Sequence, residues 1–479
     1  MKFSDLKLSN PYLNLDAITA ARVAPSPLQN PFIISVSQSA AVLLGVDENL
    51  LRDGALLKIL NAEEFLEGSE PFSMAYAGHQ FGHFAGVLGD GRVINLGKVN
   101  GQNLQLKGSG LTPYSRHGDG RAVVRSSIRE YLISEAMHGL GIATSRALGI
   151  IGSQSDVERQ GVEKGAIVLR LSPTWVRFGT FEYLNAIGEH EKIKELADYV
   201  IEESFSHLKG SEDCYLKMYA EIVKSTATTI AQWQSVGFNH GVMNTDNMSI
   251  DGCTIDYGPF AFMDDYDPHS ICNKSDTQGR YRFSSQPGVG YWNLEMLALA
   301  LSPILSKERA EEILQESYWS VYEELYFGTM YAKMGLERRD EDDRVLLARM
   351  LKALQNATID YSLFFRKLSR FDGDKSAILD IAIYREPLSA WLDTYTLRLQ
   401  KEQLSKSKRH EKMLKTNPNY ILKSHLLQEA IEGVQRDDFT LVEALLKVAL
   451  SPFEEYPELE HLATPAPQNA KNIKLSCSS

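Results

Sequence analysis

Cysteine is scarce in this chain of 479 residues, with only Cys214, Cys253, Cys272 and Cys477, and no CxxC pair occurs. This scarcity excludes a disulfide framework and a cysteine-rich zinc site. We expect Cys214 and Cys253 to be small buried hydrophobic residues. Cys477 differs, because it lies close to the end in the sequence SCSS, where no core can form.

Long hydrophobic runs and an excess of positive charge are also missing. Apolar stretches such as MLALALSPIL are interrupted by Pro or Ser, and the start of the chain resembles neither a signal peptide nor a transit sequence. The formal net charge of −12 argues against non-specific nucleic-acid binding. We expect a soluble cytoplasmic protein with no membrane and no nucleic-acid partner, in which a local basic pocket must receive any polyanionic ligand.

The chain divides into three segments by pattern. Residues 1–175 mix strand and helix signals, with strands expected at 92–99, 103–108 and 166–172 and a helix within 118–141. Residues 176–450 are mostly helical, and residues 451–479, with several prolines and acids, are expected to form a flexible, poorly ordered tail. This order predicts an α/β (α+β) protein whose mixed N-terminal lobe covers a nucleotide and whose C-terminal lobe is an extended helical one.

A glycine-bracketed turn, Gly89-Asp90-Gly91-Arg92, leads into the first of these strands. Glycines at such a turn let the backbone approach a nucleotide closely. The alternative is an ordinary hairpin turn, and the motif alone does not decide between them.

Lys107 ends the strand LQLKG, and Glu130 lies midway along the following helix. Kinases use a strand lysine held by a helix glutamate to present an ammonium group to phosphate. The alternative for Lys107 is an ordinary surface lysine, which the apolar strand and the following GSG disfavour.

Arg170 and Arg177 flank a Ser-Pro turn in VLRLSPTWVR. Arginine reads phosphate with two parallel hydrogen bonds, so this pair is a candidate for the basic pocket. Two structural salt bridges are the alternative.

The stretch HGVMNTDNMSIDGCTIDYGPF, residues 240–260, carries the strongest signal. Kinase catalytic loops read H-R-D-L-x-x-x-N, and His240 and Asn247 have the same spacing, but Val242 replaces the catalytic base. Asp246 stands directly before Asn247, and Asp256-Tyr257-Gly258 takes the place of the metal-binding D-F-G. Asn247 and Asp256 are therefore candidate ligands for a hard cation, whereas Asp246 is either functional or a turn residue.

His79 and His83 in HQFGH have a spacing that two zinc ligands on a helix would share. Gly82 weakens a helix there, and no third ligand is apparent. We therefore prefer a structural or nucleotide-lining role to a zinc site.

These motifs carry a resemblance to a known family. YAGHQFGHFAGVLGDGR, QLKGSGLTPYSRHGDGRAVVRSSIREYL, LRLSPTWVRFGTFEYL and the stretch from HGVMNTDNMSIDGCTIDYGPF to RYRFSSQP resemble the selenoprotein O (YdiU) family over about residues 71–290. The family has a protein-kinase-like two-lobed fold and acts as protein adenylyltransferases. Phe84, where a Trp is frequent, and Ser478, in place of selenocysteine, depart from its pattern.

The resemblance implies a role for each matching residue. Asp246 is implied to be the proton acceptor, and Asn247 and Asp256 to be magnesium ligands, with Mn²⁺ as a possible substitute. Glu130 is implied to be the ion-pair partner of Lys107. The implied nucleotide ligands are Gly89, Gly91, Arg92, Lys107, Asp119, Gly120, Arg170, Arg177 and Asp256.

The resemblance also implies that ATP is held inverted, so that AMP moves to Ser, Thr or Tyr hydroxyls of proteins and pyrophosphate leaves. Stabilising groups should then gather on the β- and γ-phosphates. Three other readings stay open. They are phosphoryl transfer, which Val242 disfavours; Mn²⁺-dependent uridylyl transfer from UTP; and a nucleotide-binding, redox-responsive pseudokinase scaffold.

A redox latch is the last expectation. The family associates its C-terminal Cys or selenocysteine with redox control, which makes Cys272 the plausible partner of Cys477. A Cys272–Cys477 disulfide would hold the tail near the active site, where it could obstruct acceptor entry. The alternative is an unpaired thiol on a disordered tail.

Overall fold

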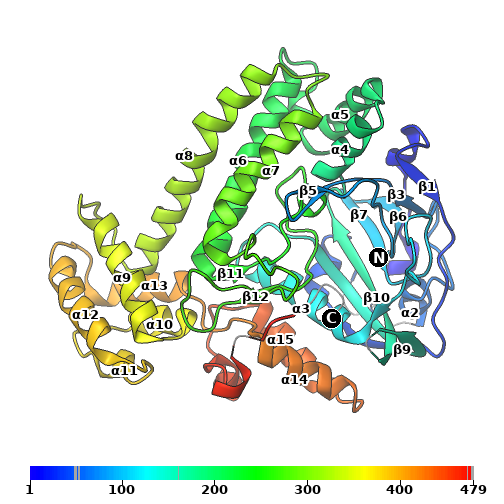
Figure 1. Ribbon diagram of the computed structural model, residues 1–479. Coiled ribbons are helices and arrows are strands. Elements are labelled where there is room, and N and C mark those ends of the chain that lie inside the picture. The colour runs from blue at the N-terminus through cyan, green and yellow to red at the C-terminus, as the bar shows by residue number, and fades with distance from the viewer. Residues whose placement is uncertain (48–50, 52–53, 160, 472, 476–479) are drawn as a thin grey trace.

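An antiparallel sheet forms the centre of the N-terminal half in the computed structural model, which describes residues 1–47, 51, 54–159, 161–471 and 473–475 (Figure 1). Its strands run in the order β1-β3-β6-β7-β10-β9-β2, and β8 pairs with β10. The bounds are β1 Ala20–Arg22, β2 Phe32–Val36, β3 Phe72–Met74, β6 Val93–Val99, β7 Gln102–Lys107, β8 Ala122–Val123, β9 Arg146–Glu158 and β10 Val162–Ser172.

Alternation along the central strands sends apolar and polar side chains to opposite faces of this sheet. On β7, Leu104 and Leu106 join a hydrophobic cluster with helices α1 (Gln38–Val42) and α2 (Gly54–Leu60). The intervening Gln105 and Lys107 point to the other face, which helix α3 (Val124–Gly139) covers. The strand pattern therefore determines which face receives the charged groups of the site.

The second half is helical (Figure 1). Its helices are α4 Phe178–Ala186, α5 His190–Ser204, α6 Cys214–Val236, α7 Gln286–Ala300, α8 Lys307–Lys333, α9 Asp343–Ala357, α10 Tyr361–Leu368, α11 Ser376–Leu379, α12 Arg385–Leu399, α13 Lys406–Thr416, α14 Ser424–Val434 and α15 Thr440–Leu450. Short 3₁₀ turns occupy Phe3–Asp5, Pro11–Asn14, Ser206–Leu208, Thr245–Asn247, Phe283–Ser285, Pro457–Ala463 and Gln468–Ala470.

Two small hairpins interrupt this pattern. One joins β4 (His79–Gln80) to β5 (His83–Phe84), and the other pairs β11 (Phe238–Asn239) with β12 (Ala261–Phe262). In the first hairpin both turn residues, Phe81 and Gly82, have positive φ. HQFGH is therefore a β-hairpin rather than a helix, which removes the helical spacing that two zinc ligands would need.

One hydrophobic core spans both halves. It includes Ile128 of α3, Ile230 of α6, Leu297 of α7 and Leu445 of α15. Helices α14 and α15 return to pack on α3, and a Cβ on Gly139 would lie only 2.0 Å from the carbonyl oxygen of Ala449. The C-terminal helices thus support α3, which itself covers the N-terminal sheet.

The mixed α/β class is confirmed, and its arrangement agrees with a kinase-like two-lobed fold. The boundary at residue 175 stays a prediction. The expectation of a poorly ordered tail also stays a prediction; in the part that the structure describes, Leu462 and Ala466 are buried and Lys471 forms an ion pair with Asp265.

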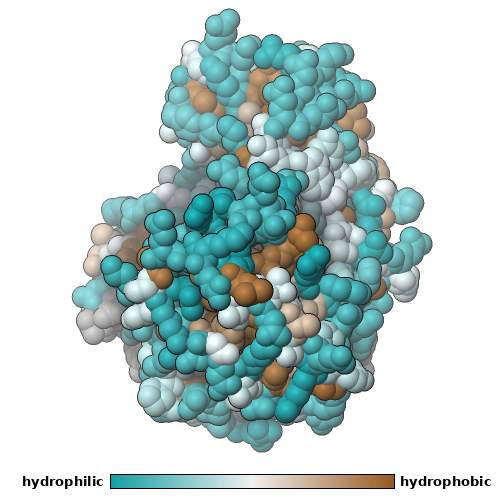
Figure 2. All heavy atoms as spheres, turned by 90° about the vertical axis from the view of Figure 1, so that its left-hand side faces the viewer, coloured by the Kyte–Doolittle hydropathy of each residue, from teal (hydrophilic) through white to brown (hydrophobic). Residues whose placement is uncertain are grey.

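Among the residues described, no helix is long and apolar enough to cross a membrane. Figure 2 shows the face that carries α8, α9 and α12 in Figure 1. Its surface is mostly hydrophilic, and the hydrophobic residues stand in separate small groups.

Candidate active site

A buried charge network lies between the sheet and α3. Lys107 Nζ is 2.6 Å from Glu130 Oε2, and Arg170 Nη1 is 2.7 Å from Glu130 Oε1. All three side chains are almost fully buried, so the glutamate compensates two cations in a region of low dielectric constant. Lys107 Nζ also lies 3.3 Å from Asp256 Oδ1.

The two terminal nitrogens of Arg170 are bound by protein partners, whereas its buried Nε has no hydrogen-bond partner among the described residues. Besides Glu130, its guanidinium donates to the carbonyl oxygen of Ile255 at 3.0 Å and to Gln105 Oε1, and it lies 4.7 Å from the ring centroid of Trp175. Gln105 is its direct cross-strand neighbour on β7. In this arrangement Arg170 braces Glu130 and the Asp256 loop.

The glycine-bracketed turn packs against the loop that follows β7. Gly89 has φ +75°, and a Cβ there would lie 2.3 Å from the ring of Tyr114. A Cβ on Gly91 would lie 3.0 Å from the Tyr114 carbonyl oxygen, and the Arg92 carbonyl oxygen accepts from the Gly108 amide at 2.8 Å. The turn thus brings the exposed Arg92 next to the end of β7, where Lys107 lies.

Asp119 and Gly120 lie on the same loop but away from the network. Asp119 forms a two-pronged pair with Arg159 at 2.9 Å and accepts from the Arg121 amide. Gly120 has φ +69° and packs on the backbone of Gly110. In this structure both residues shape the loop after Lys107.

Asp246 is buried at the edge of the catalytic-loop stretch. Gln80 Nε2 donates to its Oδ2 at 3.2 Å, whereas its Oδ1 has no hydrogen-bond partner among the described residues. Burial raises the pKa of Asp246 to about 7, against the opposing charge of Arg177. A carboxylate with this pKa and an unused oxygen suits a general base at neutral pH.

Asp256 has the opposite electrostatic character. Burial disfavours its charged form, but the positive charges of Lys107, Arg177 and their neighbours outweigh that effect and hold the pKa of Asp256 below its usual range. The pKa values of two carboxylates in one site are thus shifted in opposite directions. Asp256 stays ionised, and Asp246 can exchange a proton.

Arg177 connects the loop that carries Asp246 to the glycine-bracketed turn of the N-terminal half. It immediately precedes α4, its Nη1 donates to the Asp246 carbonyl oxygen at 2.7 Å, and its Nη2 lies 3.8 Å from Asp90 Oδ1. The guanidinium lies 4.5 Å from the ring centroid of Tyr76. This buried cation is therefore held beside Asp246 by contacts from both halves.

Asn247 is oriented by the loop itself. Its Nδ2 donates to the Val242 carbonyl oxygen at 3.0 Å, which leaves Oδ1 as the amide atom suited to a cation. The described residues contain no cluster of three or more His, Cys, Asp or Glu that could hold a metal. Asn247 and Asp256 fit the manner in which Mg²⁺ binds, through one or two protein oxygens together with substrate phosphates.

Sequence reasoning missed the glycine and glutamine that contact Asp246. A Cβ on Gly78 would lie 2.7 Å from Asp246 Oδ1, and Gln80 is the only side chain described as donating to its carboxylate. His79 Nδ1 lies 3.1 Å from Glu182, which gives this histidine a structural partner. The glycines in YAGHQFGH indicate a close approach of the backbone to another group, but the group that Gly78 approaches, Asp246, lies far away in the sequence.

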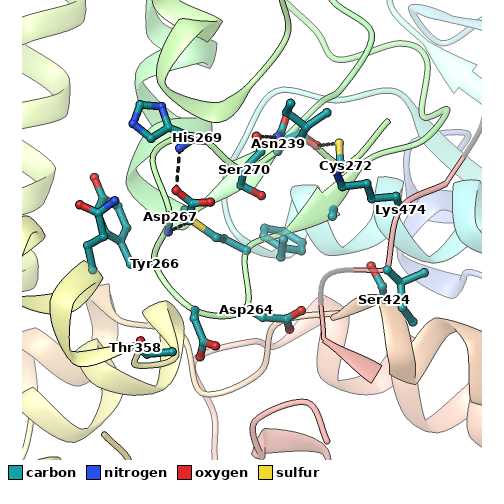
Figure 3. A pocket seen from close by; sticks show the side chains of 17 residues that line it. Asn239, Asp264, Tyr266, Asp267, His269, Ser270, Cys272, Thr358, Ser424 and Lys474 are labelled. Carbon is teal, nitrogen blue, oxygen red and sulfur yellow. Dashed lines mark hydrogen bonds between the residues drawn. The ribbon is translucent and has the colours of Figure 1, made fainter. Parts of the chain in front are cut away.

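Cys272 lies beside the C-terminal segment that carries Lys474 (Figure 3). Its Sγ points toward the carbonyl oxygen of Asn239 at 3.5 Å, and its own carbonyl oxygen accepts from the Leu475 amide at 2.9 Å. Ile473 and Lys474 line the adjacent pocket of about 380 Å³ together with Asp264 and Asp267. Cys477 lies outside the described residues, so the predicted disulfide stays a prediction.

A kinase-like two-lobed fold with a Lys-Glu pair, an Asp-Asn loop and a second acidic loop defines a class of enzymes that act on nucleotide phosphates. The comparisons make this specific. Residues 2–449 match the family model described as protein adenylyltransferase SelO. This chain therefore belongs to the SelO family and is a nucleotidyltransferase.

Curated relatives agree over nearly full length. A protein nucleotidyltransferase YdiU of Myxococcus xanthus is 45% identical and covers 99% of each chain. Proteins of the same name from Albidiferax ferrireducens and Aliivibrio salmonicida are each 44% identical, covering 95% and 100% of this chain and 94% and 99% of their own.

Proposed function

We propose that this enzyme transfers AMP from ATP to Ser, Thr and Tyr hydroxyls of other proteins and releases pyrophosphate. The observation that carries the proposal is the contrast between two carboxylates, Asp246 with a raised pKa and Asp256 with a lowered one. One is suited to accepting a proton and the other to holding positive charge.

Asp246 takes the proton of the acceptor hydroxyl. The hydroxyl oxygen then forms a bond to the α-phosphorus, while the bond from that phosphorus to the bridging oxygen breaks and its electron pair leaves with pyrophosphate. The raised pKa of Asp246 supports this role, because a general base must remain protonatable near neutral pH.

Lys107 and Arg177 stabilise the leaving pyrophosphate. Both are buried cations, and Arg177 lies directly behind the loop that carries Asp246. Positive charge beyond the α-phosphate favours a nucleotide held with its terminal phosphates inward, since charge develops on the leaving group. Arg170 contributes through Glu130 and the Asp256 loop.

Asn247 and Asp256 would hold the divalent cation, Mg²⁺ or in its place Mn²⁺, which supplies charge neutralisation on the phosphates when bound. The lowered pKa of Asp256 keeps this carboxylate ionised for that purpose.

Intact-mass analysis tests the reaction. The purified protein is incubated with a mixture of acceptor proteins and, in parallel, with ATP or UTP and either Mg²⁺ or Mn²⁺. Adenylyl additions from ATP support the proposal, uridylyl additions from UTP with Mn²⁺ support the alternative, and phosphoryl additions contradict both. The residues assigned above contact the phosphates and not the nucleobase, so this comparison is needed to distinguish ATP from UTP.

The redox latch is also proposed. Leu475 pairs with the backbone around Cys272, and this contact brings the end of the chain to the cysteine that the latch requires. The proposed bond joins Cys272 and Cys477 under oxidising conditions and fixes the tail. A cytoplasmic location, where such a bond would be transient, stays a prediction.

A further inference from the structure

A groove of about 930 Å³ opens beside the β4–β5 hairpin. The hairpin contributes Phe81 and Gly82, the segment before α7 contributes Arg280 and Arg282, and helices α7 and α8 contribute Trp292 and Trp319. None of the described residues that line it is Asp or Glu. In a chain of net charge −12, a groove lined by arginine and aromatic residues is an exception.

The two arginines are available for a ligand. Neither forms an ion pair among the described residues; Arg280 is half-buried, and its buried Nε has no hydrogen-bond partner there. The Arg280 guanidinium lies 4.6 Å from the ring centroid of Trp292, and Arg282 is exposed. The nearby Asp276 uses its carboxylate on the backbone amides of Arg280 and Tyr281.

Hydrogen bonds connect the hairpin at the edge of the groove to the catalytic loop. Gln80, which donates to Asp246, directly precedes Phe81, and the Phe81 amide donates to the Tyr281 hydroxyl at 2.8 Å. That hydroxyl donates in turn to Asn244 Oδ1 at 2.7 Å. A polypeptide whose hydroxyl reaches Asp246 would therefore extend over the hairpin turn into the groove.

We propose that this groove binds the acceptor protein as an extended segment with acidic side chains next to the modified hydroxyl. Arg280 and Arg282 pair with those acids, and the partly exposed Trp319 packs against an apolar neighbour. The proposal rests on the proposed function and adds a substrate class to it: hydroxyls flanked by Asp or Glu.

Matched peptides test the groove. Two synthetic peptides each carry one Ser and one Phe. In the acidic peptide the Ser is flanked by Asp and Glu, and in the basic peptide it is flanked by Lys at the same positions. We expect kcat/KM for nucleotidyl transfer to be about tenfold higher for the acidic peptide, which corresponds to about 1.4 kcal/mol. Arg282→Glu should remove or invert this preference without changing ATP affinity.

Arg349→Glu is the matched control, because it makes the same charge change at an exposed position on α9 outside the groove. It should retain the preference. Equal kcat/KM for the two peptides, or a preference that Arg282→Glu leaves intact, overturns the groove.

A binding measurement separates failure of the groove from failure of the reaction. In a second peptide pair Ala replaces Ser, so that no transfer occurs, and tryptophan fluorescence reports occupancy near Trp292 and Trp319. Tighter binding of the acidic peptide, lost in Arg282→Glu, supports the groove even where no nucleotide is transferred. If the enzyme transfers a nucleotide to proteins but neither assay shows a preference for the acidic peptide, the groove proposal is wrong while the proposed function stands.

Discussion

Gly78 leaves no room for a side chain against Asp246: a Cβ at this glycine would lie 2.7 Å from Asp246 Oδ1 and 2.8 Å from its Cβ. The glycine belongs to the segment before the β4–β5 hairpin, whereas the carboxylate belongs to the loop after α6. The position of the proposed base therefore depends on a contact between the two halves of the chain.

The first prediction follows from that contact. Gly78→Ala should displace the Asp246 carboxylate and lower kcat at least tenfold, because small misplacements of a reacting group are costly. ATP affinity, measured by calorimetry, should change little. Gly54→Ala is the control, since a Cβ there meets nothing within 4 Å; equal effects of both substitutions would contradict the prediction.

A second prediction separates the two acidic roles. Asp256→Ala should abolish transfer and weaken cation-dependent nucleotide binding, because it removes a proposed metal ligand. Asp246→Ala should lower transfer while largely sparing ATP binding, since a base acts on the acceptor. Transfer and nucleotide affinity are measured in both variants, and equal losses of affinity would show that the roles are not distinct.

A third prediction concerns Glu130, which lies between Lys107 and Arg170. Glu130→Gln should lower the free energy of unfolding by about 3–5 kcal/mol, because two buried cations lose their shared counter-charge. Denaturant unfolding measures this loss. Glu163→Gln, which breaks the more exposed pair with Arg125, should cost much less. A small effect of Glu130→Gln would mean that water compensates the cations.

The fourth prediction is a pH dependence of stability. Lys333 is 2% exposed, and its Nζ lies 4.2 Å from the ring centroid of Phe365. Burial lowers the pKa of Lys333 to about 7 from its ordinary 10.5. Between these values the unfolded chain binds more protons than the folded chain, so the free energy of unfolding should rise with pH.

The slope of this contribution is roughly 1 kcal/mol per pH unit above pH 7. Lys333→Met should remove it and should be more stable than wild type at pH 7, as denaturant unfolding between pH 7 and 9 would measure. Lys352→Met, at an exposed position on the neighbouring helix α9, should leave the slope unchanged. A stability difference between Lys333→Met and wild type that is independent of pH would contradict the assignment.

The fifth prediction tests the redox latch. Under oxidising conditions peptide mapping should recover a Cys272–Cys477 peptide, and transfer to acceptor proteins should increase when reductant is added. Cys477→Ser should abolish this sensitivity, whereas Cys214→Ser, at a partly buried position on α6, should retain it. Absence of the linked peptide, or unchanged sensitivity in Cys477→Ser, would exclude the latch.

Local patterns predicted much of the sheet and its site. The alternation in LQLKG gave Lys107 a face opposite to Leu106, and the helical spacing around Glu130 brought that residue to the same side. Strands expected at 92–99, 103–108 and 166–172 correspond to β6, β7 and β10. Each of these features depends on neighbours within a few residues.

Contacts between distant segments could not be predicted in this way. Asp119 pairs with Arg159 across the sheet edge, and Gln80 reaches Asp246 from the opposite half. The segment after residue 450 has a polar, proline-rich composition, and the burial of Leu462 and Ala466 is visible only in the folded structure. Such contacts depend on the assembled fold rather than on any local period.

Helix α15 is nearly the last element of the chain, yet its Ala449 carbonyl oxygen is so close to Gly139 that no side chain fits between α15 and α3. The helix that carries Glu130 therefore receives its final support only after residue 450 has left the ribosome. A nascent chain lacking α15 should not hold the Lys107–Glu130 pair firmly, so synthesis itself delays the appearance of activity until α15 has been made.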